Sequence, residues 1–199
     1  MANEAGIIMS PCRLLEENGR AHFMTKRFDR EDIRGKSHKL HVQTLCALNH
    51  LDFRQRGTHA YEQLFMTVGK LGLDDEAKSQ IFRRMAFNVM ARNCDDHTKN
   101  FGFRLRHGQS WELASAYDVT HAYNPKGEWT YQHLMSVSGK FQDISRADLL
   151  EVADRFGVRK PQDALADVRA AMDNWSSFAA DAGIPSSLRD RVAQDLLPV

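Results

Sequence analysis

A short polar segment carries the residue types and spacing best suited to chemistry. It runs from Asn93 to Asn100 and reads NCDDHTKN, so that Asp95 and Asn100 lie five positions apart. In phosphoryl transfer, a carboxylate orients the acceptor hydroxyl and takes its proton, while a nearby amide oxygen binds magnesium. A second carboxylate, Asp118, follows in the motif AYDV and could hold the metal that bridges nucleotide phosphates. The spacing therefore favours a magnesium-dependent phosphoryl-transfer site.

Two other chemistries compete for this segment. A zinc site could use Cys94–His97, but a structural zinc ion needs four ligands, and neither Cys12 nor Cys46 offers a CxxC or HxxxH partner. A nucleophilic pair of Cys94 and His97 is conceivable, yet the adjacent carboxylates oppose thiolate formation. Both interpretations are weaker than phosphoryl transfer.

The elements on either side of this segment are expected to hold it rigidly. A helix is predicted from Asp74 to Arg92, because acidic residues suit its start and apolar residues follow at helical spacing. After the segment, Phe101–Arg106 and Trp111–Leu113 predict a hairpin, in which Gly102 indicates a bulge or a close backbone approach. The apolar stripe of the helix comprises Ile81, Phe82, Met85, Ala86, Val89 and Met90.

The beginning of the chain predicts β-structure. Two half-apolar runs, Cys12–Leu15 and His22–Phe28, flank Asn18-Gly19, which is a strong hairpin signal because both turn positions accept a positive φ. A two-stranded hairpin is marginal in water, so it must pack on other strands. The charged stretch from Asp29 to Lys39 is interpreted as a linker.

The rest of the chain predicts helices. Apolar residues recur at helical spacing over Leu40–Leu48 and Ala60–Leu71. Three more helices are expected over Arg146–Phe156, Pro161–Ala180 and Ser186–Leu197, the first of them with a capping box of Ser145 and Asp148. The expected fold class is α+β and mostly α.

Composition bounds the class of protein. The 199 residues, 42% hydrophobic and 27% charged, suffice for one globular domain or two small ones. The formal net charge of +1 gives no reason to expect nucleic-acid binding. Three scattered cysteines favour a cytoplasmic protein with reduced thiols, and no signal peptide or membrane span is expected. Direct nucleic-acid binding would fall to the cluster Arg104, Arg106 and His107, which we interpret as a solvated face.

Phosphate-binding loops are not evident in the sequence. Gly35-Lys36-Ser37 matches the end of a Walker A loop, but Arg30 occupies the place of its first glycine. The pattern G-x-G-x-x-G does not occur. We therefore expect the groups that cradle nucleotide phosphates to lie outside this sequence.

Four segments carry a resemblance to a known family. They are residues 22–30 (HFMTKRFDR), 93–101 (NCDDHTKNF, preceded by Phe87-Asn88), 113–119 (LASAYDV) and 133–140 (HLMSVSGK). With them, essentially the whole chain resembles the C-terminal part of HipA-like serine/threonine kinases, the toxins of bacterial toxin–antitoxin pairs. The Asp95–Asn100 spacing is also that of the kinase pattern H-R-D-x-x-x-x-N. The resemblance implies a kinase-like helical C-lobe with a catalytic-loop hairpin over residues 37–199, and an N-lobe hairpin and hinge over residues 1–36.

Site residues also follow from the resemblance. It implies that Asp95 is the catalytic base, although Asp96 stays open as an alternative, and that Asn100 and Asp118 bind Mg²⁺. His97 and Lys99 would hold the catalytic loop or meet phosphate. The resemblance also places three residues at the hinge, where backbone groups meet the adenine of ATP: Lys26, Arg27 and Phe28.

Activity and partners are expectations of the same kind. Full-length relatives carry a phosphate-binding loop and a strand lysine upstream of the region matched here, and this sequence contains neither. Phosphoryl transfer to a cytoplasmic protein substrate would therefore be impaired unless a separate N-lobe segment is supplied. A DNA-binding antitoxin is the other implied partner. The alternative is a catalytically silent interaction module that binds an antitoxin-like partner.

Overall fold

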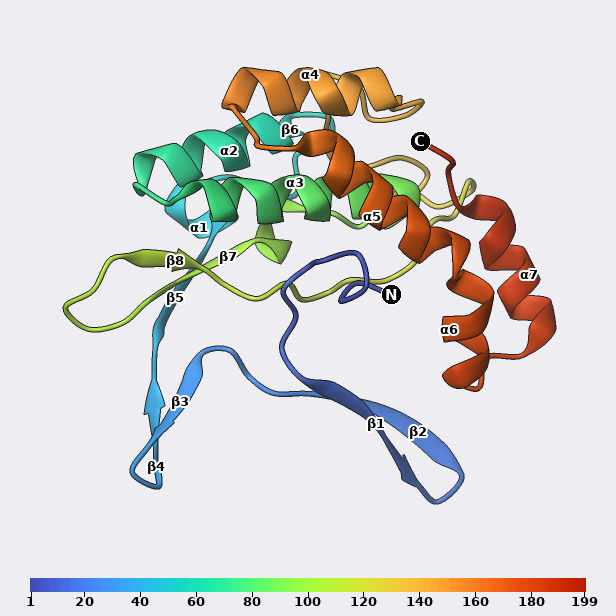
Figure 1. Ribbon diagram of the computed structural model, residues 1–199, viewed down its shortest axis with the longest axis horizontal. Coiled ribbons are helices and arrows are strands. Elements are labelled where there is room, and N and C mark those ends of the chain that lie inside the picture. The colour runs from blue at the N-terminus through green and yellow to red at the C-terminus, as the bar shows by residue number, and fades with distance from the viewer.

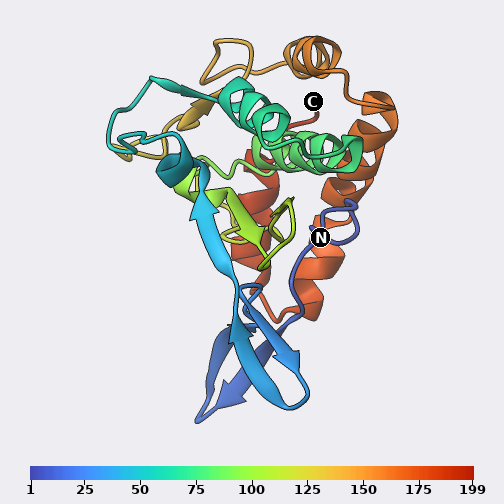
Figure 2. The same cartoon turned by 90° about the vertical axis from the view of Figure 1, so that its left-hand side faces the viewer.

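The computed structural model describes residues 1–199 and shows a mixed α+β fold. A cluster of helices forms one end of the molecule, and two hairpins project from the other (Figures 1 and 2). None of the helices is long and apolar enough to cross a membrane. The helices are α1 (Leu45–Leu48), α2 (Tyr61–Lys70), α3 (Asp75–Met90), α4 (Arg146–Phe156), α5 (Pro161–Asp173), α6 (Trp175–Asp181) and α7 (Ser186–Asp195). The strands are β1 (Cys12–Glu17), β2 (Arg20–Thr25), β3 (Arg30–Ile33), β4 (Lys36–Lys39), β5 (His41–Thr44), β6 (His59–Ala60), β7 (Gly102–Leu105), β8 (Trp111–Leu113) and β9 (Met135–Ser136).

Helix α3 forms the centre of the helical cluster. Asp74 caps its start, because the carboxylate accepts a hydrogen bond of 2.9 Å from the amide of Ala77. All six residues of the predicted apolar stripe are buried, so the predicted helix and its core face are confirmed. The helix packs on α5 along one side and on α2 along another. Its C-terminal end is thereby fixed where the polar segment begins.

The first nine residues also enter this core. Ala5 and Ile7 are buried in the main hydrophobic cluster, and Met9 pairs with Ala116 in a parallel bridge. Gln80 of α3 binds this segment on both sides, accepting from the amide of Ile8 at 2.9 Å and donating to a backbone carbonyl at 2.8 Å. The start of the chain is thus joined to the helical part.

Two hairpins follow the buried start of the chain. The predicted hairpin is confirmed as β1–β2, with Asn18 and Gly19 at φ values of 51° and 73°. The linker expected over 29–39 is wrong, because β3 and β4 form a second hairpin. Its turn residues Arg34 and Gly35 take φ values of 50° and 76°. This hairpin is mostly exposed and contains few apolar residues. Hydrophobic periodicity therefore did not predict its strands.

A three-stranded sheet, ordered β5–β7–β8, supports the polar segment. The helix predicted over Leu40–Leu48 is wrong in its first half, because residues 41–44 pair with β7 instead. The helix begins only after Thr44, whose hydroxyl accepts from the amide of Ala47 at 3.2 Å. A close approach at Gly102 is confirmed: a Cβ there would lie 3.2 Å from the Tyr117 ring.

The basic cluster on this sheet is paired rather than solvated, so that expectation is wrong for its two arginines. Arg104 donates to Glu112 at 2.8 Å, and Arg106 donates to Glu31 at 2.6 Å and also pairs with Glu112. Because Glu31 belongs to β3, the second ion pair joins the β3–β4 hairpin to the sheet. Their acidic partners leave these arginines little free charge for a nucleic acid.

The C-terminal helices follow the prediction with one difference. Ser145 and Asp148 form the predicted capping box of α4, the amide of Ser145 donating to the Asp148 carboxylate at 2.8 Å. The single helix predicted over Pro161–Ala180 is wrong, because the chain breaks at Asn174 and continues as α6. Asparagine suits such a break, since its side chain competes with the helix for backbone hydrogen bonds, and here Nδ2 donates to Ala170 O at 3.1 Å.

Candidate active site

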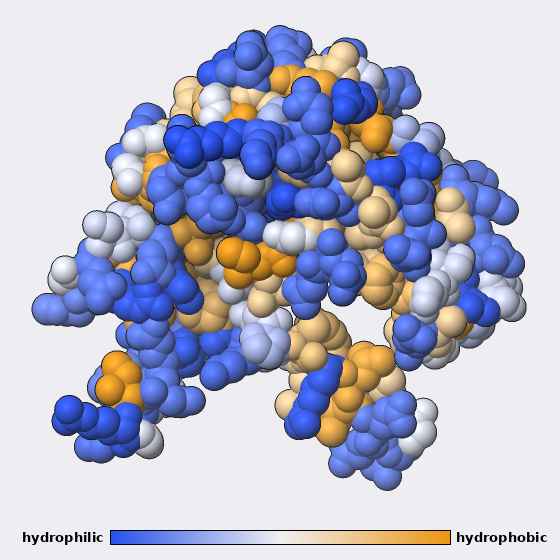
Figure 3. All heavy atoms as spheres, in the orientation of Figure 1, coloured by the Kyte–Doolittle hydropathy of each residue, from blue (hydrophilic) through white to orange (hydrophobic).

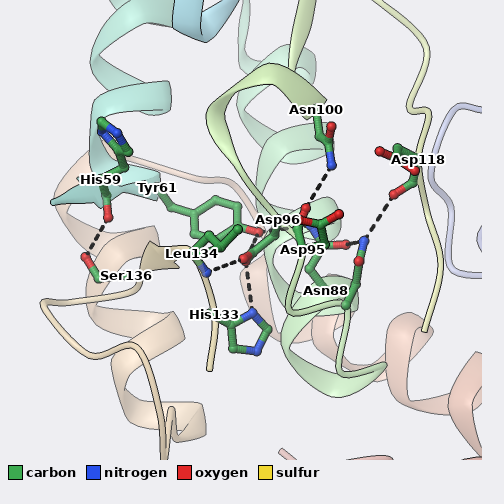
Figure 4. A network of polar contacts seen from close by, with 11 residues as sticks. His59, Tyr61, Asn88, Asp95, Asp96, Asn100, Asp118, His133, Leu134 and Ser136 are labelled. Atoms are coloured by element: carbon green, nitrogen blue, oxygen red, sulfur yellow. Dashed lines mark hydrogen bonds and ion pairs between the residues drawn. The ribbon is translucent and has the colours of Figure 1, made fainter. Parts of the chain in front are cut away.

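The polar segment after α3 winds around the backbone carbonyl of Asp95. That oxygen accepts hydrogen bonds from the amide of His97 and from Nδ2 of Asn100, both at 2.9 Å. The turn continues into a short 3-10 helix, Thr98–Asn100. The five-residue spacing therefore has a structural meaning: it lets the asparagine side chain fold back onto the aspartate backbone (Figure 4).

The Asp95 carboxylate is accessible from the surface. Its side chain is 45% exposed, and Nε2 of His97 lies 4.0 Å from Oδ1. Partial burial raises the pKa of Asp95 above its ordinary value, His97 opposes this, and the carboxylates of Asp118 and Asp96 raise the pKa further. A raised pKa makes a carboxylate a stronger proton acceptor, which suits a general base.

Asn100 and Asp118 offer oxygen ligands at the same place. Asn100 uses its amide nitrogen on the Asp95 carbonyl, so its amide oxygen has no hydrogen-bond donor and is free for a cation. The exposed Asp118 carboxylate forms no ion pair, and both residues line one small cavity. Asp118 also takes a φ of 54°, a conformation disfavoured for a residue with a side chain and often found at functional sites. Amide and carboxylate oxygens are the ligands that Mg²⁺ prefers, so these residues fit the ion.

Asp96 lies on the opposite side of the loop and has a different role. Its carboxylate is fully buried and accepts three hydrogen bonds: from Tyr61 Oη at 2.8 Å, His133 Nδ1 at 2.9 Å and the amide of Leu134 at 2.8 Å. Burial lowers the pKa of His133, but the neighbouring Asp96 raises it more, to about 10. Asp96 therefore anchors the loop to the segment around His133 and is inaccessible to a substrate.

Hydrogen bonds continue from this anchor to Asp118. Tyr61 Oη accepts from Asn88 Nδ2 at 2.9 Å, and Asn88 Oδ1 accepts from Asn93 Nδ2 at 3.1 Å. The same nitrogen of Asn93 donates to the Asp118 carbonyl at 3.2 Å. Sequence reasoning did not assign roles to Tyr61, Asn88 or His133. Asn88 could have been noticed from the sequence, because it is a polar residue among the apolar residues at the end of α3.

His97 and Lys99 both pack on Phe53, a half-buried ring in the loop before β6. Lys99 Nζ lies 3.4 Å from the Phe53 ring centroid, and the His97 ring meets Phe53 edge-on at 6.3 Å. A cation over an aromatic face is favourable, and it holds the lysine against the loop. Nδ1 of His97 is buried without a hydrogen-bond partner.

The three expected adenine-binding residues lie between the β1–β2 hairpin and β3. The Phe28 ring stacks on the ring of Tyr117, with centroids 5.3 Å apart. Because Tyr117 directly precedes Asp118 in the chain, this contact brings Phe28 close to Asp118. Arg27 pairs with Asp29 at 2.7 Å, whereas the amide of Lys26 donates to a backbone carbonyl at 2.8 Å. The structure thus places Phe28 beside the candidate site, whereas the Arg27 side chain is held by Asp29.

The cysteines and histidines do not assemble a metal centre. No three or more His, Cys, Asp or Glu side chains gather where they could hold a metal ion together. Cys94 is a buried free thiol, Cys46 is half-buried and Cys12 is exposed. The four-ligand zinc site considered from the sequence therefore finds no support in this arrangement.

Comparisons with known proteins give the family and the fold of the chain. A family model described as the HipA-like C-terminal domain matches residues 1–175. A solved complex from Shewanella oneidensis MR-1, of the toxin–antitoxin system HipA, HipB and its operator DNA, contains a chain with a similar fold. The TM-score is 0.67 at 20% identity, over 100% of this chain and 48% of that one, so this chain spans about half the length of that relative. A search of curated proteins found no match. On the family match, the chain belongs to the HipA-like C-terminal domain family.

Proposed function

We propose that this chain supplies the catalytic half of a Mg²⁺- and ATP-dependent serine/threonine protein kinase of a toxin–antitoxin system. The observation that carries the proposal is the fold of the loop around Asp95. One side chain, Asn100, is bonded to the Asp95 backbone and lines a cavity with Asp118. A proton acceptor and two magnesium ligands thereby come together on one surface.

Asp95 is the proposed general base. Its carboxylate is partly exposed, and its pKa is raised by burial and by neighbouring carboxylates. In this role it orients the acceptor hydroxyl and takes its proton as the phosphoryl group is transferred. His97, within 4.0 Å of this carboxylate, limits the rise in its pKa.

Asn100 and Asp118 are the proposed magnesium ligands. A bound Mg²⁺ would neutralise charge that develops on the nucleotide phosphates. The chain's own part is to present one amide oxygen and one carboxylate without competing partners. The hydrogen bond from Asn93 to the Asp118 carbonyl, 3.2 Å long, holds the second of these ligands in place.

The remaining site residues complete the proposal. Phe28, with Lys26 and Arg27, would meet the adenine, because its stack on Tyr117 puts it beside Asp118. Lys99 and His97 would stiffen the loop through Phe53. A protein substrate, a DNA-binding antitoxin, an N-lobe segment that binds the phosphates and a cytoplasmic location belong to the same proposal.

Nucleotide binding tests the metal ligands. Calorimetry with ATP should show binding that Mg²⁺ strengthens in the wild type, and Asp118→Ala should lose the Mg²⁺-dependent part. The control is Asp190→Ala, because Asp190 is exposed on α7 and its side chain has no partner. Equal heats for the wild type and Asp118→Ala, with a clear Mg²⁺ effect in both, would refute the metal role of Asp118.

A silent interaction module is the second candidate, and one observation favours it. The β1–β2 hairpin packs on no other strand. It exposes a patch of apolar side chains to water (Figure 3), with Phe23 68% and Leu14 48% exposed. Such a patch is typical of a surface that binds another polypeptide. Transfer of labelled phosphate from ATP that is retained in Asp190→Ala and abolished in Asp95→Asn would rule out a silent module.

A further inference from the structure

The end of the chain packs beside the candidate site although it lies outside the matched part of the family model. That model ends at residue 175, whereas α7 and the residues after it cover Ser186–Val199. The amide of Leu197 donates to the Met90 carbonyl at the end of α3 at 2.9 Å. Three apolar residues of this end pack on the main core: Leu196, Leu197 and Val199. The C-terminal segment is therefore seated where the catalytic loop begins.

Arg92 links the C-terminal segment to the loop that begins at Asn93. It takes a φ of 53° between the end of α3 and Asn93. Its Nε donates to the Asp195 carbonyl at 3.2 Å, and its guanidinium lies over the Tyr123 ring at 4.0 Å. Asp195 is the last residue of α7, where unpaired carbonyls favour a cation.

The segment that follows Asp118 is held from two directions. On the loop side, Asn93 binds the Asp118 carbonyl at 3.2 Å, and the Arg92 carbonyl accepts from the amide of Ala122 at 3.1 Å. On the α7 side, His121 Nε2 lies 3.1 Å from Asp195 Oδ2. Residues 118–123 are thus fixed between the catalytic loop and the C-terminal helix.

We infer that residues 186–199 form a C-terminal strap whose Asp195 positions the 118–123 segment, and with it the magnesium ligand Asp118, through Arg92 and His121. The inference rests on the proposed function for the role of Asp118. Asp195 is a positioning residue, because it touches Arg92 and His121 and not the ligands themselves. The left-handed backbone of Asp118, at a φ of 54°, needs such support, since such a conformation persists only when its surroundings impose it.

Asp195→Asn is the decisive variant. It keeps the backbone carbonyl that binds Arg92 and the size of the side chain, but removes the charge that faces His121. Asp190→Asn is the matched control: it makes the same chemical change on the same helix at an exposed position without partners. Both variants keep the apolar contacts of the strap, so both are expected to fold.

Two readouts separate positioning from general stability. Hydrogen exchange followed by mass spectrometry should show faster exchange over residues 119–124 in Asp195→Asn than in the wild type or the control. Mn²⁺ titration followed by electron paramagnetic resonance should show binding about three- to tenfold weaker in Asp195→Asn, within the range by which residues that do not contact the ligand alter its affinity. Since coupling is reciprocal, Mn²⁺ should also slow the exchange of this segment in the wild type.

The outcomes distinguish the strap from the proposed function. Unchanged exchange in Asp195→Asn would overturn the strap, and faster exchange with unchanged Mn²⁺ affinity would overturn its link to Asp118. A wild-type protein that binds no Mn²⁺ would instead overturn the proposed metal site, while the exchange data would still decide whether Asp195 positions the segment. The double variant His121→Asn/Asp195→Asn should add little to either single variant, because the two residues act as one pair.

Discussion

The two faces of the polar loop over residues 93–100 differ sharply although neighbouring residues form them. On the inner face, Asp96 is fully buried, and its carboxylate accepts three hydrogen bonds. On the outer face, Asp95 is partly exposed, and the carboxylate of Asp118 forms no ion pair. The inner carboxylate is engaged by the protein itself, whereas the outer carboxylates are left for ligands.

This difference shows how a loop can have a rigid backbone and still present accessible carboxylates. The inner face is built from distant elements: Tyr61 of α2 and the segment around His133 bind Asp96, and Asn88 of α3 joins them through the Tyr61 hydroxyl. Buried, satisfied polar networks of this kind fix one conformation. Because Asp95 is bonded directly to Asp96 in the chain, the fixed backbone of the inner face also fixes the outer one. The Asp95 side chain therefore needs few contacts of its own.

The largest expected effect comes from breaking the inner face. Asp96→Ala removes the charge partner of the buried His133 and leaves two donors unpaired, Tyr61 Oη and the amide of Leu134. Removing one member of a buried ion pair typically costs about 3–5 kcal/mol in unfolding free energy. Urea denaturation followed by circular dichroism should show a loss of this size.

The same substitution on the outer face is the matched control. Asp95→Ala should change the unfolding free energy by about 0.5 kcal/mol or less, because the side chain is partly exposed and its backbone carbonyl still accepts from Asn100. It should abolish phosphoryl transfer nonetheless. Equal stability losses for the two variants would show that the two faces are not distinct.

Tyr61→Phe tests the centre of the inner network with a smaller effect. The substitution keeps the ring and its edge-to-face contact with Phe101, but removes a hydroxyl that donates to Asp96 and accepts from Asn88. Two buried groups lose a partner, and such losses cost about 1–3 kcal/mol. Thermal unfolding should detect it, and an unchanged melting temperature would mean that the hydroxyl adds no net stability.

The His133–Asp96 pair predicts a pH dependence of stability. Burial lowers the pKa of His133, but Asp96 raises it more, to about 10, from an ordinary value of 6.5. The pair's stabilisation is therefore complete below about pH 6.5 and is lost as the pH rises through about 10. The unfolding free energy should fall by about 1 kcal/mol per pH unit between these values.

His133→Gln is the control for this pH dependence. The variant starts less stable, because Gln cannot offer a charge to Asp96, and its stability should depend much less on pH between 6.5 and 10. The comparison removes the imidazole, so the difference between the two pH profiles reports on His133 and its contacts. A wild type and a variant with parallel pH profiles would contradict a charged His133.

The sequence predicted the outer face better than the inner one. Local spacing carries the outer face: Asp95 and Asn100 are five residues apart, and Asp118 follows the predicted hairpin. The inner face depends on His133, which lies 37 residues from Asp96 in the chain. No local sequence pattern spans 37 residues, so the pairing of Asp96 with His133 could not be predicted from the spacing.

The same reason explains the errors in secondary structure. Helix α3 was predictable because its apolar stripe and its capping aspartate are local signals. Strand β5 was not, because residues 41–44 are held by pairing with β7, about sixty positions later in the chain. The β3–β4 hairpin depends in part on the ion pair between Glu31 and Arg106, whose two residues lie 75 positions apart in the sequence.

A smaller effect on stability than that of Tyr61→Phe is expected where the two faces meet. Asn93 donates to Asn88 on the inner face and to the Asp118 carbonyl on the outer one, at 3.1 and 3.2 Å. Asn93→Ala should cost about 1 kcal/mol in unfolding free energy and also weaken Mn²⁺ binding at Asp118. Asn88→Ala is the comparison, because it disturbs the same network without touching Asp118. If both variants weakened Mn²⁺ binding equally, the metal ligand would depend on the whole inner network; if only Asn93→Ala did, one side chain would couple the two faces.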